Sequence, residues 1–250
     1  MKAAVLSDIH GNLPALEAVL RYVGPLKVDA LVNLGDCISG PLWPAETCAL
    51  LQSLPMRTVR GNHDRAVGQA ESSPPGASDR FAWERTAREQ HRWLAELLFE
   101  LELALPGGAA RCFHANPLDD EAYLIDEVAD GRLRLADTAR ISARLGPVQH
   151  PVILCGHSHQ PRVVRLPEGA IIVNPGSVGC PAYADAGPPP HMSETGAPHA
   201  RFALVTADAG GIGVELVAVA YDWDAAAAAA TRNGRPDWAH ALRTGRAMPE

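Results

Sequence analysis

The chain has 250 residues, of which 47% are hydrophobic and 20% charged, so its composition is that of a globular protein and not of a disordered one. Its 29 acidic and 22 basic residues give a formal net charge of -7, which leaves no positive field to hold a polyanionic backbone. We therefore expect no sequence-independent binding to long nucleic acid, whereas a small anionic substrate held by metal stays open.

The five cysteines are odd in number, widely spaced and without any C-x-x-C pair, which fits a reducing compartment better than a disulfide framework. We expect them to be buried structural residues. The opening segment MKAAVLSDIHG has too short an apolar run for a signal peptide, and no stretch approaches the ~20 apolar residues of a membrane span. These features predict a cytoplasmic protein with no membrane partner.

The first apolar run is followed by polar residues that can bind a metal. Residues 2–7 predict a buried strand, after which come Asp8, His10 and a helix that begins near Leu13. Open parallel sheets bind their ligands at the carboxyl ends of strands, where Asp8 and His10 are expected to lie. Taken alone, Asp8 as a helix cap and His10 as a surface turn residue would be the simpler interpretation.

The same pattern then repeats along the chain. Residues 30–34 predict a second strand that ends at Gly35 and Asp36, and a helix follows at about 44–54. A third strand at 56–59 leads into Arg60, Gly61, Asn62, His63 and Asp64. Three strands would thus bring Asp and His, then Asp, then Asn and His to one edge of a sheet.

The middle of the chain predicts one long helix and a further strand that ends in histidine. Asp79 is expected to cap a helix that runs to about residue 101. Residues 111–113 predict a strand that leads to His114, and the acidic residues 119–121 predict a solvated loop. Residues 138–145 predict a helix.

A buried strand at residues 152–155, bounded by Pro151 and Gly156, is followed by His157 and His159. Because one residue separates the two histidines, a loop at the end of the strand can direct both imidazoles into one pocket. Neutral imidazole nitrogen is a good ligand for a divalent metal.

The last third of the chain predicts mainly strands and two helices. A hairpin at 163–173 ends in Asn174, and the proline-rich residues 184–198 predict a flexible loop. Closing strands are expected at 202–206 and 214–221, and C-terminal helices at about 222–245. No internal repeat of fixed period is visible. We predict a single domain over residues 1–250.

Five motifs in this order supply oxygen and nitrogen ligands for two divalent ions: Asp-x-His, Gly-Asp, Gly-Asn-His-Asp, a single His, and Gly-His-x-His. Two metals about 3.5–4 Å apart convert a bridging water to hydroxide and hold the oxygens of a phosphoryl group. Each motif alone is a weak signal, but their joint occurrence at strand ends argues against coincidence.

With these motifs the sequence resembles the calcineurin-like metallophosphoesterases, and among them the compact bacterial and archaeal group that includes small phosphodiesterases and diadenosine-tetraphosphatase-related proteins. Gly40-Pro41, residues 174–179 and the helix after Tyr221-Asp222 add to the likeness, which covers almost the whole chain. The resemblance implies an α/β fold of the metallo-dependent phosphatase type. This fold is a four-layer α-β-β-α sandwich with the site at its strand ends.

The resemblance also implies a role for each motif residue. The first metal would be held by Asp8, His10 and His159, the second by Asn62, His114 and His157, and Asp36 would bridge the two. His63 would lie at the phosphate, where it protonates the leaving group or stabilises its charge, and Asp64 would orient it. Mixed Asp, His and Asn ligation suits two divalent transition-metal ions, with Mn as our first choice and Fe, Ni, Co or Zn as alternatives.

Three further polar residues lie next to the motifs and are candidates for substrate binding: Asn12, Arg60 and Asn174. Each also has a structural interpretation, as a helix cap, a surface charge and a turn residue respectively. His191 and His199 could reach the site from the proline-rich loop, although surface positions explain them as well.

We therefore predict a dinuclear-metal-dependent phosphoesterase that acts on a small phosphoester or nucleotide through a metal-bridging hydroxide. A phosphodiesterase or dinucleoside polyphosphate hydrolase is preferred over a phosphomonoesterase or protein phosphatase, because Ser39-Gly40-Pro41 stands where protein phosphatases usually carry Asp-Arg-Gly. The other alternative is a catalytically vestigial protein-binding module, since a retromer subunit shares the fold without the catalytic histidine. The intact His63 argues against that alternative, and a homo-oligomer stays open.

Overall fold

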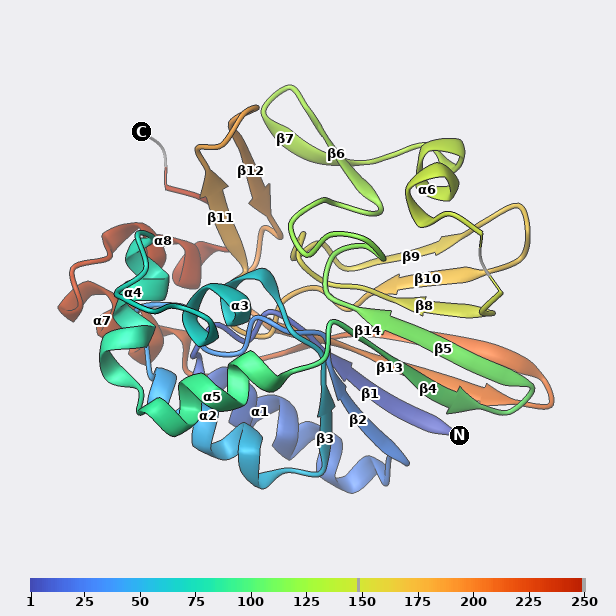
Figure 1. Ribbon diagram of the computed structural model, residues 1–250, viewed down its shortest axis with the longest axis horizontal. Coiled ribbons are helices and arrows are strands. Elements are labelled where there is room, and N and C mark those ends of the chain that lie inside the picture. The colour runs from blue at the N-terminus through green and yellow to red at the C-terminus, as the bar shows by residue number, and fades with distance from the viewer. Residues whose placement is uncertain (148, 249–250) are drawn as a thin grey trace.

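Two five-stranded sheets lie face to face at the centre of the molecule, in a computed structural model that describes residues 1–147 and 149–248 (Figure 1). The first sheet has the order β14-β13-β1-β2-β3 and the second the order β4-β5-β8-β10-β9. The strands of the first sheet are β1 (Lys2–Leu6), β2 (Ala30–Asn33), β3 (Met56–Thr58), β13 (Ala200–Asp208) and β14 (Gly211–Val219). Those of the second are β4 (Glu100–Leu105), β5 (Gly108–Phe113), β8 (Val152–Leu154), β9 (Arg162–Arg165) and β10 (Ile171–Asn174).

Parallel pairing at the middle of each sheet determines where the functional residues meet. β1 pairs in parallel with β2 and β2 with β3, while β8 pairs in parallel with both β5 and β10. The carboxyl ends of parallel neighbours lie at the same edge of their sheet. The loops that follow these strands are therefore gathered at one end of the sandwich.

The apolar side chains of the sandwich form three cores: one between the two sheets and one on the outer face of each sheet. Val5 and Val32 of the first sheet pack against Leu103 and Leu154 of the second in the layer between them. The outer face of the first sheet is covered by α1 (Leu13–Val23), α2 (Pro44–Ser53) and α5 (Arg88–Glu96), and the outer face of the second by α6 (Thr138–Leu145). The predicted four-layer α-β-β-α sandwich is confirmed.

A third sheet of four short strands stands over the strand ends of the sandwich (Figure 1). Its order is β11 (Ala182–Asp185), β12 (His191–Glu194), β7 (Arg132–Leu135) and β6 (Asp126–Ala129). The prediction of a flexible loop over residues 184–198 was therefore wrong. Its proline-rich composition belongs to the turn, whereas β12 buries Ser193 completely and its hydroxyl donates to the carbonyl of Ser158.

The long helix predicted from Asp79 was also wrong, because two helices occupy the segment. α4 (Ala77–Arg85) ends at Thr86, whose backbone is extended and whose hydroxyl donates to the carbonyl of Ala82. Such a local bond from side chain to backbone competes with helix continuation. Residues 100 and 101, expected at the end of the helix, begin β4 instead. Leu101, Leu103 and Leu105 of this strand face inward at the two-residue period of a strand.

The C-terminal helices lie where the sequence predicted them. α7 (Trp223–Arg232) begins after the capping residue Asp222, and α8 (Pro236–Thr244) packs against it around Ala226 and Leu242. All five cysteines are buried and have free thiols, as expected. Within the described part of the chain, no helix has both the length and the apolar character needed to cross a bilayer.

Candidate dinuclear metal centre

Two clusters of potential metal ligands meet where the parallel strands end. Asp8, His10 and His159 form one cluster, and Asp36, His114 and His157 form the other. Within each cluster the donor atoms lie within 4.8 Å of one another. The first cluster comes from the ends of β1 and β8, and the second from the ends of β2, β5 and β8. The first cluster has the same members as the first metal set implied by the resemblance, whereas the second contains Asp36, which the resemblance implied as a bridge, beside His114 and His157.

Most of the candidate ligands have a backbone conformation that residues other than glycine rarely adopt. Among the described residues, seven that are not glycine have positive φ, and five of them are candidate ligands: Asp8, His10, Asp36, His157 and His159. Left-handed backbone is costly for such residues and tends to concentrate at functional sites. Here it is enforced by hydrogen bonds, since the amide of Asp8 donates to Gly35 and that of His10 to Asp36.

The histidines are oriented by carbonyl groups behind them. The Nδ1 atoms of His10, His114 and His159 each donate to a backbone carbonyl at 2.7 Å. Each Nε2 of a neutral ring then has its lone pair free. His157 is reversed, because its Nε2 donates to the carbonyl of Glu121 at 2.6 Å and leaves Nδ1 free. All four rings can therefore offer nitrogen to a metal.

The donor set fits divalent cations. Nε2 of His10 lies 3.2 Å from Nε2 of His159, so two lone pairs would face each other without an ion or a proton between them. Oδ1 of Asp8 is buried with no hydrogen-bond partner in the described structure and lies 3.3 Å from Nε2 of His159. Buried carboxylate and imidazole groups with unused lone pairs are the donors that transition-metal ions take.

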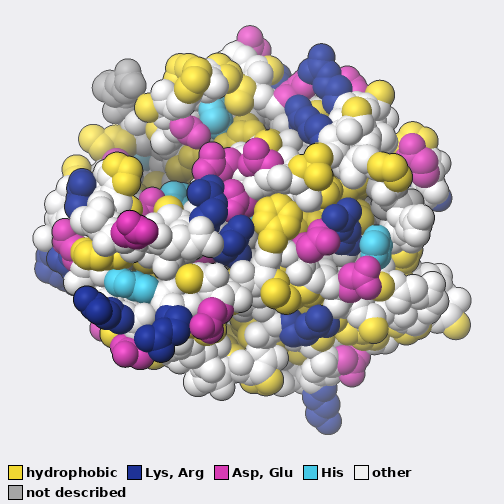
Figure 2. Space-filling model, in the orientation of Figure 1, with side chains coloured by type: hydrophobic (Ala, Val, Ile, Leu, Met, Phe, Trp, Pro, Cys, Tyr) yellow, Lys and Arg dark blue, Asp and Glu magenta, His cyan; other side chains and the backbone are white. Residues whose placement is uncertain are grey.

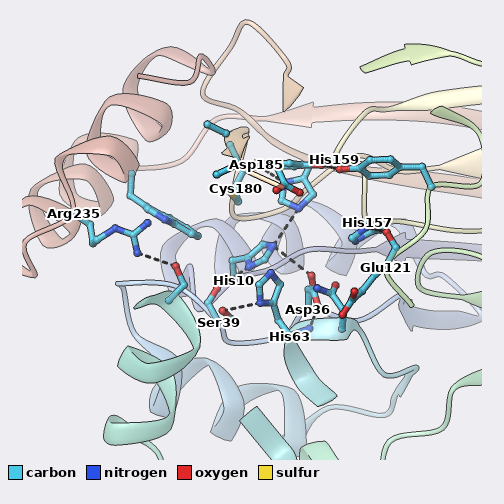
Figure 3. Close-up of a pocket in the computed structure, with 17 residues that line it drawn as sticks. His10, Asp36, Ser39, His63, Glu121, His157, His159, Cys180, Asp185 and Arg235 are labelled. Atoms are coloured by element: carbon cyan, nitrogen blue, oxygen red, sulfur yellow. Dashed lines mark hydrogen bonds and ion pairs between the residues drawn. The ribbon is translucent and has the colours of Figure 1, made fainter. Parts of the chain in front are cut away.

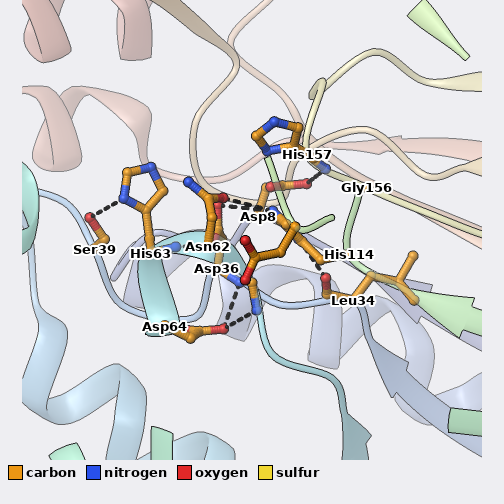
Figure 4. A network of polar contacts seen from close by, with 12 residues as sticks. Asp8, Leu34, Asp36, Ser39, Asn62, His63, Asp64, His114, Gly156 and His157 are labelled. Atoms are coloured by element: carbon orange, nitrogen blue, oxygen red, sulfur yellow. Dashed lines mark hydrogen bonds and ion pairs between the residues drawn. The ribbon is translucent and has the colours of Figure 1, made fainter. Parts of the chain in front are cut away.

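Asp36 reaches both clusters. Its Oδ2 lies 3.8 Å from Nε2 of His10 and 3.4 Å from Nε2 of His114. This position between the two clusters is the one that a bridging carboxylate needs. Oδ1 of Asn62 lies 3.1 Å from Nε2 of His114, which places the amide with the second cluster (Figure 4).

The electrostatics of the two clusters decide which rings carry protons before metal binds. Burial alone would lower the pKa of His114, but the carboxylates of Asp36 and Asp8 raise it to about 9. Burial also opposes protonation of His159, but the charge of Asp8 raises its pKa well above the usual value. Burial and the neighbouring His159 lower the pKa of His10 to about 4. Protons on His114 and His159 therefore balance the two aspartates when no metal is bound.

Asp64 positions Asp36 and not His63, contrary to the sequence-based expectation. Its carboxylate accepts hydrogen bonds from the amides of Asp36, Cys37 and Gly61, each at 2.9 Å (Figure 4). Gly61 is required by this packing, since a Cβ there would lie 2.1 Å from Oδ1 of Asp36. Asp64 and Gly61 together fix the loop that carries the central aspartate.

His63 is held instead by Asp79. Its Nδ1 lies 2.7 Å from Oδ1 of Asp79, which also accepts a hydrogen bond from the hydroxyl of Ser39 at 2.6 Å. Burial alone would lower the pKa of His63, but the charge of Asp36 and the bond to Asp79 raise it to about 10. In the metal-free protein the ring is therefore protonated at neutral pH, and it lines the cavity beside the first cluster (Figure 3). Sequence analysis predicts only a capping role for Asp79, because nothing local ties it to His63.

Asn12 and Asn174, two of the candidates for substrate binding, have structural roles instead. Asn12 is fully buried, caps α1 by accepting from the amide of Ala15, and donates to Gly179 and Tyr221. Asn174, also fully buried, donates to Gly156 and Ser158 and accepts from the amide of Gly176, so it organises a turn. The residues that line the cavity include neither of them.

Arg60 lies outside the cavity, in a shallow depression that it shares with Arg65. Its Nη2 is 3.9 Å from Asp120. Asp120 was expected in a solvated loop, but it is only 7% exposed because Arg65 binds its two oxygens at 2.8 Å each. Arg65 also binds the carboxylate of Glu121 at 2.7 Å, so these charges are paired with one another, although Glu121 also lines the cavity.

A cavity of about 420 Å³ opens over the two clusters (Figure 3). Its walls include Tyr123, Tyr183 and Asp185 on the side of the third sheet and Arg235 and Trp238 at the start of α8. None of these five residues was singled out from the sequence. Of the two loop histidines, His191 bonds to the hydroxyl of Tyr123, whereas His199 packs against Trp223 away from the cavity. On the face of the molecule drawn in Figure 2, Lys and Arg side chains are interleaved with Asp and Glu.

Comparison with known proteins agrees with the fold. The family model for the calcineurin-like phosphoesterase superfamily domain matches residues 1–192, which include all the candidate metal ligands. An uncharacterized protein of Methanocaldococcus jannaschii is 29% identical over 257 residues, with 94% of each chain covered.

Solved structures share the whole fold. A metallophosphoesterase of Sphaerobacter thermophilus superposes with a TM-score of 0.74 at 23% identity, over 98% of this chain and 99% of that one. A hypothetical protein of Pyrococcus horikoshii gives a TM-score of 0.77 at 21% identity, over 98% of each chain. Since the family model spans well over half of the sequence, the chain belongs to the calcineurin-like phosphoesterase superfamily.

Proposed function

We propose that the protein is a dinuclear-metal-dependent phosphodiesterase that acts on a small phosphodiester or a dinucleoside polyphosphate. One arrangement carries the proposal: Asp36 of the second cluster also reaches the first, and His63, held by Asp79, lines the same cavity. The proposed cofactors are two divalent transition-metal ions, Mn first, with Fe, Ni, Co or Zn as alternatives.

The residues of the chain have two chemical roles, which are to hold the metal ions and to donate a proton. When bound, two divalent ions acidify a water molecule and neutralise the charge of phosphoryl oxygens. Asp36 is placed between the clusters, and the carbonyls behind the histidines fix the directions of their nitrogens. His63 binds Asp79 through Nδ1, so its Nε2 proton is available to a leaving oxygen.

The cavity supports a small substrate. Its volume of about 420 Å³ lies within the range of small-molecule sites, roughly 300–1,000 Å³. The third sheet and α8 enclose it from two sides, an arrangement that suits a nucleotide-sized ligand better than a folded protein surface. The sequence Ser39-Gly40-Pro41 after Gly35-Asp36 likewise lacks the Asp-Arg-Gly expected of protein phosphatases.

Hydrolysis of two chromogenic esters tests the proposal. Metal-stripped protein, with and without added Mn, is assayed on bis-p-nitrophenyl phosphate and on p-nitrophenyl phosphate. His63→Ala is the test variant, and His199→Ala, which lies away from the cavity, is the matched control. We expect Mn-dependent cleavage of the diester that is lost in His63→Ala and kept in His199→Ala.

Two other results would redirect the assignment. Faster cleavage of the monoester than of the diester would favour a phosphomonoesterase. Absence of any hydrolysis of either ester with two metals bound would favour the protein-binding alternative.

A further inference from the structure

The first turn of α8 forms a wall of the cavity that lies outside the segment matched by the family model. That segment ends at residue 192, whereas Arg235 and Trp238 line the cavity. The ring of Trp238 stands edge-to-face to that of His10, with the centroids 5.9 Å apart. Figure 3 places Arg235 on the side of the cavity opposite His157. The start of α8 therefore brings an aromatic ring and a guanidinium next to the candidate metal centre.

Trp238 is fixed by close packing on the loop that follows β2. A Cβ on Gly40 would lie 3.0 Å from Cη2 of Trp238 and 2.5 Å from the carbonyl oxygen of His10. Only glycine at position 40 lets the indole approach so closely. The ring also contacts the apolar cluster of α7 and α8 around Leu42. Trp238 is only partly buried, so the rest of its ring is open to the cavity.

Arg235 is held in place and keeps spare donors. Its Nε and Nη2 bind Asp237 at 3.0 and 2.7 Å, and its Nη1 donates to the hydroxyl of Ser78 at 2.9 Å. A guanidinium has five N–H bonds, so these three contacts leave two for a ligand. Ser78 precedes Asp79, which holds His63. Arg235 is therefore anchored to the helix turn that positions the candidate acid.

The chemistry of this wall matches a flat organic group attached to a phosphate. An exposed indole beside an anion-binding centre offers stacking to a nucleobase, and a guanidinium offers hydrogen bonds to its oxygens or to those of the sugar. A second aromatic ring also lines the cavity, since Tyr183 packs on His159 with the centroids 4.8 Å apart. A small alkyl group would leave both rings without a partner.

We propose that Trp238 and Arg235 form a subsite for the organic group of the substrate, and that this subsite selects phosphodiesters of nucleosides over small alkyl diesters. Trp238 stacks on the base, and Arg235 donates its remaining N–H groups to oxygens of the nucleoside. The inference rests on the proposed phosphodiesterase function and names its substrate class.

Two diesters that release the same chromophore test the subsite: thymidine 5′-(p-nitrophenyl) phosphate and methyl p-nitrophenyl phosphate. They are compared in Mn-loaded wild type, Trp238→Leu, Trp238→Phe and the control Trp223→Leu, whose residue lies in α7 outside the cavity lining. We expect Trp238→Leu to lower kcat/KM for the thymidine diester by about 5- to 100-fold, mainly through KM. The same variant should lower kcat/KM for the methyl diester by a smaller factor, so that the preference for the thymidine diester falls by about fivefold or more, and Trp238→Phe should keep most of that preference.

Equilibrium dialysis with thymidine 5′-monophosphate measures the subsite without turnover. Weaker binding by Trp238→Leu, but not by Trp238→Phe or Trp223→Leu, supports the subsite even if wild type hydrolyses neither diester, in which case only the proposed function fails. Equal losses on both diesters in Trp238→Leu, or nucleotide binding that is unchanged in that variant, would overturn the inference.

Discussion

Nδ1 of His63 and Oδ1 of Asp79 lie 2.7 Å apart, although the two residues belong to different helices, α3 (Asn62–Gly68) and α4. The carboxylate of Asp79 also accepts from Ser39, in the loop that follows β2. One buried carboxylate thus connects the candidate acid to the loop beside the candidate metal centre. It holds the ring orientation and favours the protonated form of His63.

Asp79→Asn should lower kcat/KM on the diester by about 10- to 100-fold with little change in KM, because the amide keeps an acceptor but removes the charge. Asp79 helps to raise the pKa of His63 to about 10, so its loss lowers that pKa. The protonated ring is then lost at a lower pH. The alkaline limb of the profile of kcat/KM against pH should shift toward neutrality. Asp137→Asn, which keeps its cap on α6, is the control, and an unshifted limb would contradict the prediction.

Metal binding should release protons, because His114 has a pKa of about 9 in the metal-free protein. Below that pH a divalent ion must displace the proton, so the apparent affinity of the second cluster should rise with pH and level off above about 9. Calorimetric titration with Mn in two buffers of different ionisation enthalpy counts the protons released. An affinity that is the same at pH 6.5 and pH 9 would show that His114 is already neutral.

Gly61→Ala should disrupt the centre without replacing a candidate ligand. The added Cβ would lie 2.1 Å from Oδ1 of Asp36 and 2.5 Å from its amide, so the loop must move. We expect a loss of about 2–4 kcal/mol in the free energy of unfolding and less than two bound Mn per chain. Gly24→Ala is the matched control, since nothing lies within 4 Å of its added Cβ. Urea unfolding and metal analysis of both variants decide the matter.

The parts of the site that the sequence predicts are those that follow an apolar strand directly. Asp8, Asp36 and His157 each come within three residues of a strand, so local pattern and parallel topology suffice to bring them together. Asp79 and Trp238 lie in the first turns of helices, where no local pattern distinguishes them from ordinary polar and core positions. Their roles depend on tertiary packing.

The errors have equally specific causes. Asn12 and Asn174 stand beside the motifs, yet their amides bind backbone groups inside the fold. A buried amide and a substrate-binding amide look the same in sequence, since both are polar residues in glycine-rich turns. The helix expected to run to residue 101 concealed β4 because Leu94, Leu97 and Leu101 also fit a helical period.

Arg65 should act on the second metal through a loop and not by contact. Its Nε and Nη2 bind Asp120 at 2.8 Å, and the next residue, Glu121, accepts through its carbonyl the 2.6 Å hydrogen bond from Nε2 of His157 (Figure 3). This carbonyl fixes the ring of His157, and Arg65 fixes the loop that presents it. Loss of such support for a ligand lowers the affinity for the metal by about 10- to 100-fold.

Arg65→Ala should therefore weaken one of two Mn binding steps by about tenfold and leave the other nearly unchanged, because His10 and His159 bind other carbonyls. Arg21→Ala, which removes an exposed ion pair to Glu17 on α1, is the control for loss of a surface charge. Manganese titration followed by electron paramagnetic resonance resolves the two steps. Equal weakening of both would show that Arg65 acts through the net charge of the site, because a long-range charge effect cannot distinguish clusters that share Asp36.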